Sequence, residues 1–161
     1  MLQDLIRELQ SFTSSLPEIV QWLGVMVAAA IPFIESYTGS VLGVLVGINP
    51  VVAVLAAIVG NLVSMLVVVL GADGLRSRLG AGKGTKEPSP RAQKLRARFD
   101  RYGVAGVSLV GQTILPSQIT SATMVSFGAS RNAVVFWQAI SITVWGTAFG
   151  ALATLGVNLV G

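Results

Sequence analysis

The sequence predicts an all-α integral membrane protein, an inverted repeat of two re-entrant helical hairpins, each followed by a transmembrane helix, plus amphipathic interfacial helices. Composition predicts the class, because only 11% of the 161 residues are charged and 53% are hydrophobic, whereas soluble domains carry about 25% charged residues. Mean hydropathy is +0.75. The repeat is predicted by a proline-containing polar break within apolar sequence in each half of the chain. At this length we expect a single membrane domain over residues 1–161.

Residues 1–14 predict an amphipathic helix that lies at the bilayer interface. Asp4, Arg7 and Glu8 share its polar face. Its apolar residues recur at helical spacing and are Leu2, Leu5, Ile6, Leu9 and Phe12. This pattern is typical of a helix with one face in the headgroup region.

The first repeat is predicted over residues 16–72 and begins with a re-entrant hairpin. Residues 15–18 have the form of a capping box with a proline in the first turn, so a helix is expected to start there. Pro32 then breaks that helix. After a polar segment comes the short apolar piece 41–46, which is too short to cross a bilayer, since about 20 apolar residues are needed.

The first hairpin leads through a turn into a full span and then a basic loop. Gly-Ile-Asn-Pro at 47–50 has the composition of a turn, and residues 51–71 are long and apolar enough to span. The segment 73–102 follows as a basic loop and helix that Gly103 is expected to end. Nine of the eleven basic residues lie within 73–101, and the positive-inside rule therefore places this loop in the cytoplasm.

The second repeat is predicted over residues 103–161 and has the same plan as the first. Its expected pieces are a short helix at 104–110, a polar break at 111–118, a short helix at 119–127, a turn at 128–132 and a span at 133–160. With the basic loop inside, the first hairpin enters from outside and the second from the cytoplasm. The N-terminus is then expected outside, unless residues 17–34 span the membrane fully, which their length just permits. Two halves of opposite orientation place a transport site at the midplane, where the hairpin tips would meet.

Glu35 is the first candidate for that site, because it is the only charged residue between Ile19 and Ala72. Intramembrane carboxylates usually face a cavity, a partner or a proton pathway, and helix breaks such as that at Pro32 are where transporters build their sites. Glu35 would exchange a proton or bind a cationic cargo. Alternatively, it caps the freed N–H groups near Thr38 and Gly39.

Uncharged polar residues are the remaining candidates, and each has a structural alternative. The polar residues of the second break either line the transport cavity or satisfy backbone groups freed around Pro116. Asn61 and Gln138 either hydrogen-bond into the site or hold neighbouring helices together. The candidate binding residues are Glu35, Pro32, Thr38, Asn61, Gln112, Thr113, Pro116, Ser117, Gln118 and Gln138, with Thr120 and Ser121 beside them.

The residue types that are missing limit the chemistry. There is no Cys and no His, which removes thiolate chemistry, the usual proton shuttle and the commonest metal ligands. A single intramembrane carboxylate is too little for hydrolysis. We therefore expect no enzyme, no metal and no cofactor.

Several short motifs resemble the small multidrug export protein family. They are Ala-Ile-Pro-Phe-Ile-Glu at 30–35, Gly-Ile-Asn-Pro at 47–50, Gly-Asn at 60–61 and Tyr-Gly-Val-Ala-Gly at 102–106. That family is distantly similar to the DedA/SNARE-associated membrane proteins, which have two re-entrant hairpins and are linked to lipid-carrier translocation. The resemblance implies a bacterial inner-membrane transporter or flippase. The DedA pattern has arginines around the second break, whereas residues 112–118 carry no charge here, so recognition of a lipid phosphate is unsupported.

These patterns together predict a small transporter or flippase-like protein that moves a small molecule or a lipid, coupled to protons through Glu35. The alternative is a non-transporting accessory or scaffold subunit of a larger membrane complex, in which Glu35 pairs with a basic residue. The expected partners are membrane lipids, the transported molecule or lipid carrier, and a second copy of the chain, because one chain encloses little volume. Nucleic acid is not expected, since the basic loop adjoins membrane spans.

Overall fold

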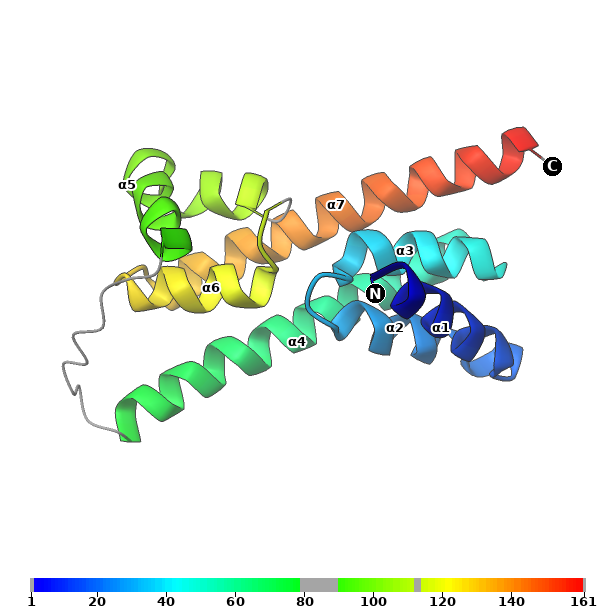
Figure 1. Cartoon of the computed structure of the whole chain (residues 1–161), viewed down its shortest axis with the longest axis horizontal. Helices are drawn as coiled ribbons and strands as arrows, with labels where there is room; N and C mark the ends of the chain where they lie inside the picture. The colour runs from blue at the N-terminus through cyan, green and yellow to red at the C-terminus, as the bar shows by residue number, and fades with distance from the viewer. Residues whose placement is uncertain (1, 79–89, 112–113, 161) are drawn as a thin grey trace. The chain divides into compact units, whose positions relative to one another are not determined.

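The computed structural model describes residues 2–78, 90–111 and 114–160, and all regular elements in these ranges are helices (Figure 1). The all-α prediction is therefore confirmed. In chain order the elements are α1 (Leu2–Ser15), the 3-10 helix η1 (Glu18–Val20), α2 (Gln21–Ala30), α3 (Glu35–Val46), α4 (Pro50–Arg78), α5 (Pro90–Gly111), α6 (Ser117–Ser126) and α7 (Arg131–Val160).

The chain divides into two compact units. The first unit comprises Met1–Val63 and Ile142–Gly161, and the second comprises Ser64–Ser141. The first therefore holds α1 to α3 with parts of α4 and α7, and the second holds α5 and α6 with the remaining parts of α4 and α7. Each unit contains one of the two predicted hairpins.

The end of α1 differs from the expected capping box at residues 15–18. Ser15 is the last residue of α1, and its Oγ donates a 2.7 Å hydrogen bond to the carbonyl of Phe12. The residue that precedes η1 is Pro17, which has no side-chain capping bond. The prediction was wrong because α1 continues to Ser15, whose hydroxyl is used within its own helix.

The turn between α3 and α4 is as predicted. Gly47 has a left-handed φ of 94°, and the Ile48 N–H donates a 3.1 Å bond to the Gly43 carbonyl. This arrangement satisfies the last carbonyls of α3 and favours glycine, which has no Cβ to clash. On the other side, Asn49 Oδ1 accepts a 3.0 Å bond from the Val51 N–H, and α4 starts with Pro50. A side-chain cap and a proline at the first position are typical of a helix start.

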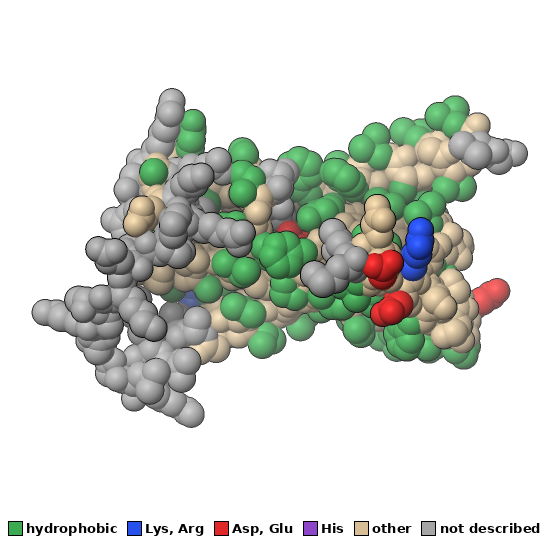
Figure 2. All heavy atoms as spheres, in the orientation of Figure 1, with side chains coloured by type: hydrophobic (Ala, Val, Ile, Leu, Met, Phe, Trp, Pro, Cys, Tyr) green, Lys and Arg blue, Asp and Glu red, His purple; other side chains and the backbone are tan. Residues whose placement is uncertain are grey.

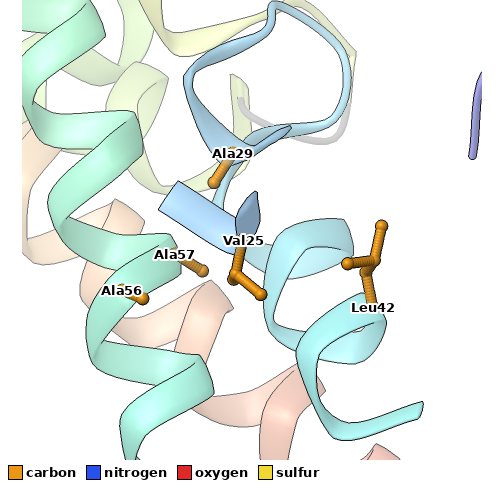
Figure 3. Close-up of a cluster of buried hydrophobic side chains, with 5 residues drawn as sticks. All are labelled: Val25, Ala29, Leu42, Ala56 and Ala57. Atoms are coloured by element: carbon orange, nitrogen blue, oxygen red, sulfur yellow. The ribbon is translucent and has the colours of Figure 1, made fainter. Parts of the chain in front are cut away.

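The first unit is held together by close packing of small residues. A Cβ on Gly43 would lie 2.6 Å from the Cβ of Ala53, and one on Gly60 would collide with the backbone carbonyl of Met26. These two contacts bring α4 against both arms of the α2–α3 hairpin. The buried apolar cluster between them is shown in Figure 3 and consists of Val25, Ala29, Leu42, Ala56 and Ala57.

Helix α1 covers the hairpin of the first unit. Leu9 packs against the apolar cluster, and Thr13 is fully buried, with its Oγ1 donating 2.7 Å to the Leu9 carbonyl. The opposite face carries the exposed Asp4, Arg7 and Glu8, and Figure 2 shows charged side chains gathered over α1. The predicted amphipathic helix thus packs part of its apolar face against the rest of the first unit.

Among the described residues, two helices are long and apolar enough to cross a membrane, Pro50–Gly71 within α4 and Arg131–Leu159 within α7. Only 39% of the most apolar 18-residue stretch is buried in α4, and only 22% in α7. The exposed side of α4 is itself apolar, with large hydrophobic side chains every four residues at Val51, Leu55, Val59, Val63 and Val67. The buried core helix of a soluble protein has the opposite arrangement, because its apolar residues face inward.

In the second unit, α5 bends at Gly103 and is followed by a break and α6. Gly103 has a φ of 65°, so its backbone leaves the helical conformation where a helix end was predicted, and Figure 1 shows the change of direction. The second break is shorter than predicted, because α6 begins at Ser117 directly after Pro116, whose ψ of 142° is extended. Proline suits the position before a first turn, since it needs no N–H partner there.

Candidate functional site

Glu35 is completely buried and lies at the start of α3. Ile31 is extended (ψ 128°), as expected for a residue before proline. The chain then turns tightly, and the N–H groups of Ile34 and Glu35 both donate to the Ile31 carbonyl, at 3.1 and 3.3 Å. The predicted break at Pro32 therefore places the carboxylate of Glu35 in the interior of the first unit.

The backbone of this turn is strained at two residues. Phe33 has a φ of 75° and Glu35 a φ of 54°, and these are the non-glycine residues with positive φ in the described part of the chain. Left-handed backbone is unfavourable for side chains with a Cβ. Such strain persists only where the surrounding structure imposes it, and it concentrates at functional sites.

Other polar side chains are buried in the first unit with Glu35. Ser36, Ser40 and Asn61 are all fully buried. Ser36 Oγ donates a 2.8 Å bond to the Ile142 carbonyl on α7, and Ser40 Oγ donates 2.7 Å to the Ser36 carbonyl. Asn61 was predicted from the sequence, whereas the two serines were missed. Their one sequence signal is the four-residue spacing, which places both on one face of α3.

Three aromatic rings follow Glu35 in the same unit. The Tyr37 and Phe149 ring centroids are 5.6 Å apart, and those of Trp145 and Phe149 are 5.9 Å apart. Tyr37 Oη also donates a 3.4 Å bond to the Phe33 carbonyl. These rings are half-buried, so they join α3 to α7 beside the turn that carries Glu35.

The second unit contains a separate set of buried polar side chains, which we call the polar layer. It is defined by Ser108 on α5, by Ser117, Gln118 and Ser121 on α6, and by Gln138 and Ser141 on α7, each at most 2% exposed. Gln118 Nε2 donates 3.2 Å to Ser64 Oγ on α4, and Ser141 Oγ donates 2.7 Å to the Ser108 carbonyl. The layer therefore connects four helices and carries no charge.

The predicted site residues differ in their placement. Pro116 is buried, Thr38 is half-buried, and Pro32 is exposed. Gln112 and Thr113 lie outside the described residues. Of the serines in the polar layer, Ser108 and Ser141 were missed, although Ser141 follows Gln138 by three residues and so shares its helical face.

In the described part of the chain every regular element is a helix, two helices are long enough to cross a membrane, and buried polar side chains form one acidic and one neutral group. The chain matches no protein-family model, no curated protein and no solved structure.

Proposed function

We propose that this protein is a small integral membrane transporter or flippase-like protein in which Glu35 exchanges a proton for the transported cargo. The membrane assignment is supported by α4 and α7, whose exposed sides are apolar over the length of a bilayer. In water these faces would be unpartnered, whereas lipid tails solvate them. Membrane lipids and a second copy of the chain are the expected partners.

The observation that carries the proposal is the complete burial of Glu35 on strained backbone in a broken helix. A buried carboxylate is costly, so its retention there is best explained by function. Discontinuous helices present such groups to substrates and coupling ions in transporters. This combination supports transport more directly than either feature alone.

The charge balance of the first unit favours a proton or an organic cation as the species handled. Its sequence contains one basic residue, Arg7, which is exposed on α1. A buried carboxylate avoids the cost of its charge by taking up a proton, or it offsets that charge with a bound cation. Alternation between these two states is the elementary step of proton-coupled exchange.

The scaffold alternative is less well supported. It requires Glu35 to pair with a basic residue of another subunit, but the carboxylate is 0% exposed within this chain alone. A partner's basic side chain would stay paired with it only if the hairpin stayed open in the complex, whereas transport requires opening only during each cycle. The exposed apolar sides of α4 and α7 are compatible with either lipid or a partner subunit, so they do not favour the scaffold.

Reconstitution tests the proposal. The protein is inserted in liposomes that enclose a pH-sensitive dye, and tetraethylammonium is added outside as an impermeant organic cation. Wild type should release internal protons in exchange, and Glu35→Gln should lose at least nine-tenths of that flux. Glu8→Gln, which neutralises an exposed acid on α1, is the matched control. Wild-type vesicles without flux, from protein that co-purifies with one stoichiometric partner, would favour the scaffold.

A further inference from the structure

The polar layer of the second unit lies next to an apolar cluster on the same helices. Val107, Met124 and Val134 form that cluster, one from each of α5, α6 and α7. On α6, Ser121 precedes Met124 by three residues, and on α7, Gln138 follows Val134 by four, so each lies one turn along the same face. Because α6 and α7 are antiparallel on either side of the turn at Gly128, Ser121 and Gln138 both lie nearer to the break at Pro116 than the apolar cluster does.

Hydrogen bonds account for only part of this layer. The bonds from Gln118 to Ser64 and from Ser141 to Ser108 use three side chains and one backbone carbonyl. Three buried atoms, Ser108 Oγ, Ser121 Oγ and Gln138 Oε1, have no hydrogen-bond partner among the residues that the structure describes. Such atoms are rare in native proteins, since each one loses its bonds to water on burial. Three such atoms, one on each of the helices α5, α6 and α7, point to a bound species.

The chemistry of these atoms limits what that species can be. All three are neutral oxygens, and the segments that carry the layer, 104–111, 117–126 and 132–141, contain no charged residue. An anion would need N–H donors or basic side chains, and a divalent cation is normally held by carboxylates. Hydroxyl and amide oxygens suit an alkali cation, which neutral oxygens coordinate in membrane proteins.

The burial of the layer selects a small cation. Ser108 and Ser121 are 0% exposed and Gln138 is 1% exposed, so any occupant of the closed layer is enclosed by protein atoms, which suits a bare ion. We propose that the polar layer binds a sodium ion through Ser108 Oγ, Ser121 Oγ and Gln138 Oε1. This site is distinct from Glu35, and the inference does not depend on the proposed exchange of protons.

Trp137 provides a local reporter, because it directly precedes Gln138 on α7. The other two tryptophans, Trp22 and Trp145, are replaced by Phe, and the emission of the purified protein is titrated with NaCl against choline chloride at constant ionic strength. A sodium site predicts a saturable change with sodium that choline does not produce. The response should weaken at least tenfold in apparent affinity in Ser121→Ala and in Gln138→Leu.

Thermal unfolding in the two salts separates the site from a purely structural role. If no ion binds, Ser121→Ala removes an unpartnered buried hydroxyl, so the melting temperature stays the same or rises in both salts. If sodium binds, the variant loses the stabilisation by sodium, because ligands stabilise only the state they bind, and its melting temperature in choline stays the same or rises. Ser126→Ala, at an exposed position of α6, is the control, and Ser108→Ala is the second test variant.

Equal emission and equal melting temperatures in sodium and choline would overturn the proposal, as would a sodium response that persists in Ser121→Ala and Ser108→Ala. Glu35→Gln should retain the full sodium response. The failure of the sodium site and the failure of the proposed function are therefore distinguishable.

Discussion

The Oγ atom of Ser36 donates a 2.8 Å hydrogen bond to the backbone carbonyl of Ile142, which lies 106 residues further along the chain. Ser36 directly follows Glu35, and a Cβ on Gly146, one turn after Ile142, would lie 3.1 Å from the Ser36 Cβ. The strained turn before α3 is thus hydrogen-bonded to α7 at the residue next to Glu35. Strained backbone persists only where its surroundings hold it, and this contact is one such restraint.

Ser36→Ala should therefore destabilise the protein and slow exchange at Glu35. The loss of one buried hydrogen bond costs about 1 kcal/mol, so the melting temperature in detergent should fall. Ser40→Ala is the matched control, because Ser40 is equally buried but bonds only within α3, to the Ser36 carbonyl. If both variants melt alike and exchange alike, the bond to Ile142 has no special role.

Gly60→Ala should be strongly destabilising. A Cβ at this position collides with the Met26 carbonyl, and overpacking of this kind costs about 1–3 kcal/mol. Gly71→Ala on the same helix is the control, since a Cβ there meets nothing within 4 Å and should gain up to about 1 kcal/mol of helix propensity. Thermal unfolding of the two variants should move in opposite directions, and a stable Gly60→Ala would refute the close approach of α2 and α4.

Cysteine labelling tests the inverted repeat without interference, because the natural chain has no cysteine. Ser11→Cys on the exposed side of α1 should react with an impermeant maleimide added to intact cells, since the proposed topology leaves this end outside. Thr85→Cys in the basic loop should react only after the membrane is opened, in accordance with the positive-inside rule. Labelling of Ser11→Cys from the cytoplasm alone would contradict an outside N-terminus and weaken the inverted repeat.

Local features of the fold were predictable from sequence, whereas contacts between distant segments were not. The turn at 47–50, the helix end at Gly103 and the breaks at Pro32 and Pro116 follow from backbone properties of glycine and proline, which act within a few residues. The capping box at 15–18 failed because α1 extended by one residue and used the Ser15 hydroxyl.

The candidate site was predictable only in part for the same reason. Glu35 is conspicuous because an isolated charge in apolar sequence has few explanations. Ser36, Ser108 and Ser141 are ordinary small residues in the sequence, and they acquire a role only through helices brought beside them by the fold. The polar layer could be suspected from Gln118 and Gln138, but its membership could not be derived from spacing along one helix.

The central claim, that Glu35 exchanges a proton for an organic cation, is tested most directly by proton release on binding. Tetraethylammonium is added to purified protein in weakly buffered detergent solution, and a pH indicator records the protons released per chain. Wild type and Glu8→Gln should release protons in proportion to the cation bound, and Glu35→Gln should release none. Cation binding without proton release in wild type, or unchanged release from Glu35→Gln, would contradict the account.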